Sequence, residues 1–296
     1  MSQAMISQSL YGGRVIIGRD RYHRYVVEKN DITHKTGLVG VSVTSLLKIL
    51  DKTALRQWYA NQSVEYLRDQ YRAKKGKLEE ADFEAAKQAA NNFANGARVT
   101  GGNVDDAISA YIRAQLEGAK WTRPAMSPAE TNAFLAFQKW AIHEHIQFTA
   151  SQRILYHPEL NVAGCLDVAY RKHGQDYRGD FKATDLTKHG TDQDGNPVIF
   201  MEWGLQIGMY TTLEQAEVAV TAMHDQGEAA GIAAGEAFSP KMTILKLDKI
   251  HGGFQEAEVP YHHSVAGACM LYLNGVYHNE IYQDNLKKQR EKWGSK

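Results

Sequence analysis

Apolar residues recur every three or four positions through much of the first half of the chain, a spacing that is typical of amphipathic helices. It predicts helices over residues 54–75, 78–97, 104–117 and 128–145. Runs of β-branched and aromatic residues before them predict strands over residues 14–18 and 22–28. Thr44 or Ser45 is expected to cap a short helix that ends at Leu50. The first half is therefore expected to be mostly helical, with strands at its start.

The pattern changes after residue 147, where short runs of β-forming residues alternate with glycine and proline. Strands are expected over residues 148–156, 161–171, 176–183, 241–249 and 254–260. Helices are expected over residues 198–214 and 264–292. Residues 187–197 are typical of an exposed loop, residues 218–221 of a short strand, and residues 227–235 of a loop or a weak helix.

The mixture of helices and strands predicts an α/β (α+β) fold, with a central mixed sheet flanked by helices. The 296 residues suffice for one large domain, or for a core with an added helical part. We expect residues 1–147 to supply the first strands and the helical part, and residues 148–296 to form the core. The two parts are expected to make one continuous globular unit.

Two aspartates and a lysine lie on neighbouring strands of the predicted sheet. Asp167 is in one strand, and Asp180 and Lys182 are in the next. Alternate side chains of a strand share a face, so Asp180 and Lys182 are expected to point the same way. A hairpin-like turn at Gly174 is expected to bring Asp167 close to Asp180. Converging carboxylates bind hard divalent cations such as Mg²⁺, and a lysine beside them can stabilise charge on a phosphate oxygen.

Three motifs follow one another along the chain: Gly164-x-x-Asp167, Asp180-x-Lys182 and Gln206-x-x-x-Tyr210. In these motifs and their order the chain resembles the PD-(D/E)xK nuclease superfamily. Within the superfamily the chain is similar to the branch of RecB-type nuclease domains, CRISPR-associated exonucleases and mitochondrial genome maintenance exonucleases. The resemblance extends upstream through residues 41–46 and 21–25, and covers most of residues 20–215.

This resemblance implies a restriction-endonuclease-like core with a metal site. Asp167, Asp180 and the backbone carbonyl of Phe181 would bind Mg²⁺ or Mn²⁺, and Lys182 would serve catalysis. Two positions depart from the family pattern. Asp105 stands where many members have a histidine, and it would be a further metal ligand.

The second departure is Gln152, which stands where a glutamate is common and would be a poorer metal ligand. Glu144, nearby in sequence, is an alternative source of a carboxylate. The resemblance also assigns Gln206 and Tyr210, which share a helix face, to a DNA channel that the N-terminal part helps to form.

The function implied by the resemblance is that of a metal-dependent DNA exonuclease. It would act on single strands or ends of DNA, in phage or bacterial replication or recombination. Two alternatives stay open. The chain could be an inactive DNA-binding or interaction module that keeps the fold, or a metal-dependent endonuclease that cuts internally.

The composition of the chain argues against several classes of protein. The 34 Lys and Arg residues balance the 34 Asp and Glu residues, which argues against a protein that coats nucleic acid over its whole surface. Only Cys165 and Cys269 are present, so an iron–sulfur cluster with four cysteine ligands is not expected. The N-terminus lacks a signal-peptide pattern, and no apolar run reaches the length of a membrane span. A cytoplasmic location without a membrane partner is therefore expected, in the host cell if a phage encodes the protein.

Overall fold

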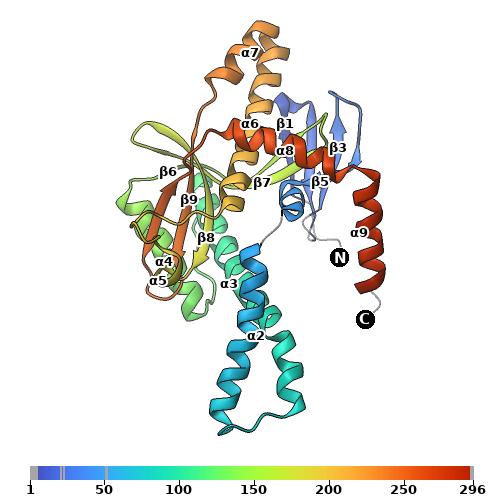
Figure 1. Cartoon of the computed structure of the whole chain (residues 1–296). Helices are drawn as coiled ribbons and strands as arrows, with labels where there is room; N and C mark the ends of the chain where they lie inside the picture. The colour runs from blue at the N-terminus through green and yellow to red at the C-terminus, as the bar shows by residue number, and fades with distance from the viewer. Residues whose placement is uncertain (1–5, 21, 23, 51–52, 294–296) are drawn as a thin grey trace.

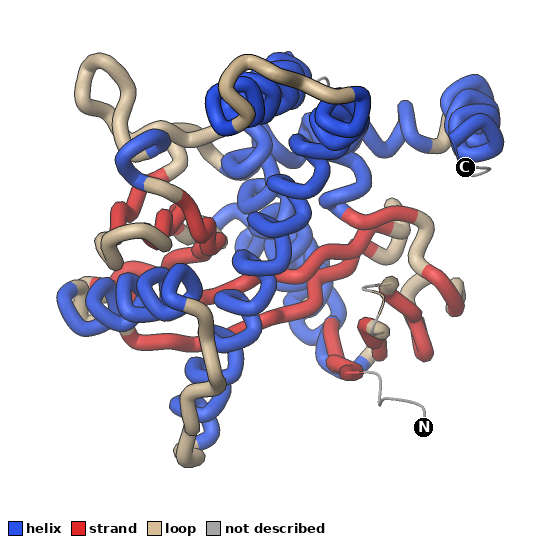
Figure 2. Tube along the Cα trace, turned by 90° about the horizontal axis from the view of Figure 1, so that it is seen from below, coloured by secondary structure: helices blue, strands red, loops and turns tan. Residues whose placement is uncertain are grey.

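The computed structural model describes residues 6–20, 22, 24–50 and 53–293. Within these residues the protein has one six-stranded and one four-stranded β-sheet, and helices pack on the larger sheet (Figure 1). Figure 2 shows the N-terminal strands as a separate group beside the long strands of the main sheet. The expected mixed α/β fold, with a mixed sheet flanked by helices, is confirmed.

The N-terminal sheet is antiparallel and packs against the main sheet. Its strands, in spatial order, are β1 (Ile6–Leu10), β2 (Val15–Arg19), β3 (Tyr25–Asn30) and β4 (Gly37–Leu38). Alternate residues of β2, Val15 and Ile17, are fully buried in a cluster with Ile154 and Tyr156 of the main sheet. The hydroxyl of Tyr11 donates to the carbonyl of Tyr156 over 2.6 Å. The small sheet is thereby fixed to the strand that borders the candidate site.

The main sheet combines parallel and antiparallel pairs. Its strands are β5 (Val41–Ser42), β6 (Gln147–His157), β7 (Val162–Lys172), β8 (Gln175–Thr184), β9 (Lys241–Asp248) and β10 (Phe254–Glu258). β8 pairs with β7 in the antiparallel sense and with β9 in the parallel sense. β5, from the N-terminal third of the chain, pairs in parallel with the start of β7. The strands of the expected hairpin are thus central in the sheet.

Helices cover both faces of the main sheet. The helices of the described residues are α1 (Val43–Leu46), α2 (Thr53–Ala73), α3 (Glu80–Glu117), α4 (Pro128–His143), α5 (Leu186–His189), α6 (Met201–Gln226), α7 (Glu228–Ala237), α8 (His263–Tyr277) and α9 (Glu280–Trp293). Of these, α2, α7 and α9 pack on other helices and lie away from the sheet (Figure 1). On one face, α6 and α8 contribute Met209 and Met270 to an apolar cluster with the strands. On the other, α3 and α4 contribute Ile108, Phe137 and Trp140 to a second cluster. None of the helices in the described ranges is both long and apolar enough to cross a bilayer.

Several expected boundaries are wrong. The short helix α1 is capped by Ser42, whose hydroxyl accepts from the N–H of Ser45, and not by Thr44 or Ser45. The two helices expected over residues 78–97 and 104–117 form the single helix α3, because its packing on α4 outweighs the low helix propensity of the glycines between them.

The regions on either side of β9 also differ from expectation. Residues 218–221 continue α6 as a helix and do not form a strand. Residues 228–237 form the helix α7, and the loop after β8 begins with the short helix α5. The expected last helix is divided into α8 and α9 at residues 278–279. Local β-propensity at residues 218–221 is overridden by tertiary packing, because this end of α6 packs on α7, where Ala219 lies against Gly235.

Candidate active site

A break in the pairing of β7 makes room for the candidate site. β6 pairs with β7 along most of its length, so β5 and β8 must share the opposite edge of β7. On that edge, β5 pairs with Val162 and Ala163, and β8 begins to pair at Val168, opposite Gly179. Within the described chain, residues 164–166 therefore pair only with β6, and Asp167 pairs with neither β5 nor β8. The first sequence motif lies at this break.

The side chain of Asp167 replaces a missing backbone partner at the break. Its Oδ2 accepts a hydrogen bond of 3.1 Å from the N–H of Phe181 on β8. The Phe181 ring packs in the opposite layer, 5.6 Å from the ring of Phe137 between centroids. Asp180 is 1% exposed, and its Oδ2 lies 2.5 Å from Nζ of Lys182. The two carboxylates and the ammonium group are thus grouped at the point where β7 and β8 stop pairing.

Asp105 and Gln152 approach the same place from α3 and β6. Gln152 falls opposite Asp167 in the β6–β7 register and has a positive φ of 50°. Its Nε2 donates to Oδ2 of Asp105 over 3.0 Å. Its Oε1 accepts from Nη1 of Arg19, over 3.3 Å, and from Sγ of Cys165, over 3.1 Å. The oxygen that could bind a metal is therefore engaged by two donors.

Helix α6 supplies the third motif. Nζ of Lys182 donates to Oε1 of Gln206 over 3.5 Å, and Nε2 of Gln206 donates to the hydroxyl of Tyr210 over 3.1 Å. Tyr210 is 3% exposed. Its burial, followed by the charges of neighbouring groups, raises the pKa of its phenol well above the usual value, so it stays neutral. Gln206 connects the lysine to a rigid, buried tyrosine.

Burial and neighbouring carboxylates raise the pKa values of Asp105 and Asp167. Burial, then the charges of Asp106 and Asp180, raises the pKa of Asp105 to about 6. Burial, then Asp105 and Asp180, raises the pKa of Asp167 well above its usual range. Burial alone would lower the pKa of Lys182, but the attraction of Asp180 and Asp167 outweighs it and raises that pKa. Negative charge is concentrated in a poorly solvated space, which favours a bound cation.

A cleft of about 220 Å³ opens beside these groups. Its walls come from α3, β8, β9 and α6, and include Gly101, Asp105, Lys182, Thr184 and Trp203. Nζ of Lys182 lies 5.9 Å from the ring centroid of Trp203, within the range of a cation–π contact. The cleft thus presents a carboxyl group, an ammonium group and an aromatic ring to whatever enters it.

The donor types of this site suit a hard divalent cation. Oδ1 of Asp180 and Oδ1 of Asp105 are buried without a hydrogen-bond partner, and Oδ2 of Asp180 is paired with Lys182. Over the residues that the structure describes, no three His, Cys, Asp or Glu side chains are already drawn together as a metal cage. A cation would therefore bind by drawing Asp105, Asp167 and Asp180 inward, and such oxygen-only donor sets are those that Mg²⁺ and Mn²⁺ prefer.

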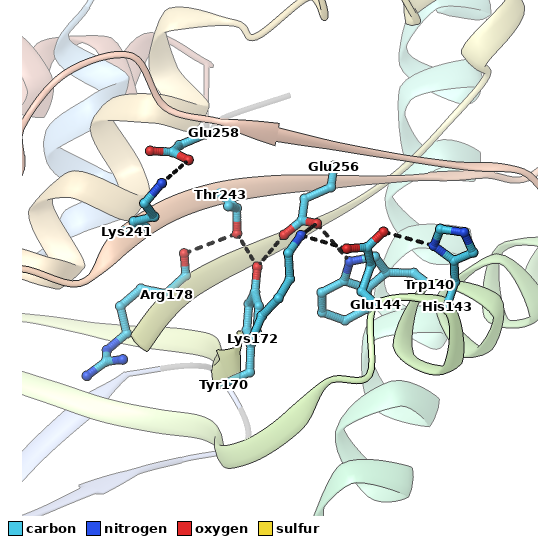
Figure 3. A network of polar contacts seen from close by, with 10 residues as sticks. All are labelled: Trp140, His143, Glu144, Tyr170, Lys172, Arg178, Lys241, Thr243, Glu256 and Glu258. Carbon is cyan, nitrogen blue, oxygen red and sulfur yellow. Dashed lines mark hydrogen bonds and ion pairs between the residues drawn. The ribbon is translucent and has the colours of Figure 1, made fainter. Parts of the chain in front are cut away.

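Glu144 belongs to a different network. Figure 3 shows it beside His143, Lys172 and Glu256, on the side of the sheet where α4 packs. Nζ of Lys172 lies 2.9 Å from Glu144 and 2.6 Å from Glu256, and the hydroxyl of Tyr170 donates to Glu256 over 2.6 Å. Glu144 is thus held by structural partners and does not supply the carboxylate that Gln152 lacks.

Two basic residues near the site, Arg19 and Lys246, were not predicted from the sequence. Arg19 is far from the motifs in sequence and joins the site only through packing of the small sheet. Lys246 is fully buried on β9 and donates to the carbonyls of His189, Gly190 and Val198 over 2.9, 2.7 and 3.1 Å. The sequence indicates the buried position of Lys246 only by placing a lysine within an otherwise apolar strand.

Comparison with models of protein families and with curated proteins finds no match. Of the upstream segment at residues 21–25, residues 21 and 23 lie outside the described part of the chain. Residues 41–46 form β5 and α1, beside the break in β7. The function is therefore inferred from the order of the motifs and from the geometry of the site.

Proposed function

We propose that this protein is a metal-dependent DNA exonuclease of the PD-(D/E)xK type, built on a restriction-endonuclease-like core. The observation that carries the proposal is the grouping of Asp167, Asp180 and Lys182 at the break between β7 and β8. The family resemblance assigns metal binding and catalysis to these same residues. The preference for DNA, and for single strands or ends, comes from that resemblance alone.

In this proposal, Asp105, Asp167 and Asp180 hold the cation, with the carbonyl of Phe181 as a further ligand. When bound, Mg²⁺ or Mn²⁺ would lower the pKa of a water ligand and neutralise charge on the phosphate. Lys182 lies 2.5 Å from Asp180, which holds its ammonium group at the cleft. Its role is to stabilise the negative charge that develops on a phosphate oxygen.

Gln206 and Tyr210 act through Lys182. The Gln206 amide bridges the ammonium group and the Tyr210 hydroxyl, so it fixes the lysine relative to α6. Because Tyr210 is buried and neutral, this support does not change with pH in the neutral range. The two residues are positioning residues; Tyr210 is buried against β7, so of the two only the part-exposed Gln206 would border a strand of DNA.

The test is cleavage of end-labelled linear DNA and covalently closed circular DNA, with Mg²⁺, with Mn²⁺ or with a chelator. An exonuclease degrades the linear DNA only when metal is present. Asp180→Asn and Lys182→Met should each lower the rate roughly 100-fold or more. Asp176→Asn, at an exposed position of the same strand that pairs with Arg171, is the matched control and should keep the rate. Unchanged cleavage by both site variants would overturn the assignment, and cleavage of circles would indicate an endonuclease.

One observation favours a second candidate, an inactive module that keeps the fold. Gln152 is neutral, and its Oε1 is engaged by Arg19 and Cys165. If the site has lost its metal, equilibrium dialysis should find no Mn²⁺ bound to the protein. If the site is active, Asp167→Asn should reduce Mn²⁺ binding sharply relative to the parent.

A further inference from the structure

Arg19 brings a positive charge from the N-terminal sheet to the acidic site. It ends β2, where it pairs with Tyr25 of β3. Its guanidinium carbon lies 5.9 Å from the centroid of the Tyr25 ring, and its Nη1 donates to Gln152. Burial raises the pKa of Asp105, whereas the charge of Arg19 acts in the opposite sense. The arginine is thus close enough to contribute to the electrostatics of the carboxylates.

The amide of Gln152 can face only one way in this arrangement. A guanidinium group donates hydrogen bonds and cannot accept them, so the oxygen of the amide must face Arg19. Its NH₂ group then faces Asp105, where it donates over 3.0 Å. Gln152 therefore offers the acidic cluster a donor, in the place where a glutamate would offer a second negative ligand. Arg19 and Gln152 act together to reduce the negative charge on this side of the site.

The charge of the site suits one divalent cation better than two. Asp105, Asp167 and Asp180 supply three negative charges, against the positive charges of Lys182 and Arg19; Asp106, which also acts on Asp105, is exposed, so solvent and salt screen its charge. One divalent ion would change the small negative surplus into a small positive one. A second ion would enter a region that is already positive, and like charges a few ångströms apart in a poorly solvated site repel strongly.

The geometry points to a site that holds a single divalent cation, in which Arg19 supplies the second positive charge and binds a phosphate oxygen of the substrate. This inference rests on the proposed nuclease function. An arginine is suited to the role because its planar guanidinium group binds phosphate through two parallel hydrogen bonds. Gln152 would hold it in place, as a positioning residue.

The number of bound ions tests this inference without relying on activity. Equilibrium dialysis of the full chain against Mn²⁺ should give one ion per chain for the parent and for Gln152→Glu, in which the new carboxylate pairs with Arg19. The double variant Arg19→Met/Gln152→Glu should bind two. Arg24→Met/Gln152→Glu, which removes an exposed arginine directly before β3, should still bind one.

Each other outcome has a distinct meaning. Two ions in the parent, or one ion in the Arg19→Met/Gln152→Glu variant, would overturn the inference and leave the nuclease proposal intact. No bound ion in the parent would overturn the nuclease proposal itself.

A second measurement addresses the phosphate contact: with Ca²⁺ in place of Mg²⁺, Arg19→Met should weaken binding of a short DNA oligonucleotide about tenfold, and Arg19→Lys should recover part of it. Equal binding by Arg19→Met and the parent, with both folded by circular dichroism, would exclude that contact.

Discussion

The ring of Tyr210 fills the space that a side chain at Gly164 would occupy. A Cβ on Gly164 would lie 2.7 Å from Cδ1 of Tyr210, and closer still to Cε1. Gly164 belongs to the first sequence motif and Tyr210 to the third. The two motifs are therefore in direct contact, at the place where α6 packs on β7. That contact fixes the helix that carries Gln206, and Gln206 in turn contacts Lys182. The glycine acts through packing, at a distance from the carboxylates.

Gly164→Ala should therefore destabilise the protein by about 1 to 3 kcal/mol, because the added methyl group overpacks a buried contact with little room to adjust. Chemical denaturation measures this loss. In a Tyr210→Ala background the same substitution should be much less harmful, since the ring it collides with is gone. If the loss is equal in both backgrounds, the packing account of Gly164 is wrong.

A different glycine, Gly101, lies where α3 borders the cleft. A Cβ at this position would meet no atom within 4 Å, so the fold does not require a glycine here. Gly101→Ala should stabilise the protein by roughly 0.5 to 1 kcal/mol, because alanine is the better helix former. We expect the methyl group to obstruct substrate in the cleft and to raise KM severalfold.

Gly96→Ala is the matched control for this prediction. Gly96 is in the same helix, also has open space around it, and does not line the cleft. It should give the same gain in stability with no change in KM. Equal KM values for the two alanine variants and the parent would show that substrate does not pass Gly101.

Local sequence patterns were sufficient to locate the strands of the site and to identify the charged residues that these strands carry. The alternation of Asp180, Phe181 and Lys182 places the charged pair on one face and the ring on the other, as expected for a strand. The pattern could not show why Asp167 meets Phe181. That meeting depends on the break between the β5 and β8 pairings of β7, and β5 is more than a hundred residues away in sequence.

The same limit applies to the long helix and to the distant basic groups. Gly101 and Gly102 have low helix propensity, and only the packing of α3 on α4 shows that the helix continues through them. Arg19 reaches Gln152 through tertiary packing of the small sheet. No short-range spacing encodes such contacts, so they could not be derived from periodicity.

Lys246 is predicted to hold the loop between β8 and α6. Its buried ammonium group bonds the carbonyls of His189 and Gly190 at one end of the loop and of Val198 at the other. Lys246→Met should leave these carbonyls without a donor and lower the free energy of unfolding by about 1 to 3 kcal/mol. Limited proteolysis should then cut within residues 191–197 faster than in the parent.

Lys241→Met provides the control for Lys246. Lys241 is on the same strand but is partly exposed and pairs with Glu258 at the surface, an interaction that contributes at most about 1 kcal/mol. It should not change the rate of cutting in the loop. Loop cutting at the parental rate in Lys246→Met would show that the loop is held by other contacts.

The start of α8 contains an exposed histidine packed against a buried one, a pair that should make stability depend on pH. The rings of His262 and His263 are 4.0 Å apart between centroids, and His263 is 1% exposed with no hydrogen-bond partner for its Nε2. Burial, then the neighbouring charge of His262, lowers the pKa of His263 to about 4. The imidazole of His263 is therefore neutral in the folded protein at pH 7.

This depressed pKa fixes the sign of the pH dependence. Between the usual histidine pKa of about 6.5 and a pKa of about 4, the unfolded chain takes up a proton that folded His263 does not. The stability that neutral His263 contributes is therefore fully present above pH 6.5. It is lost as the pH falls toward 4, which lowers the free energy of unfolding by at most about 3 kcal/mol. His263→Leu should flatten the fall in unfolding free energy between pH 7 and pH 4.5, whereas His224→Gln, at an exposed position of α6, serves as the control for loss of one histidine. If the free energy of unfolding falls as steeply with pH in His263→Leu as in the parent, other groups cause the fall.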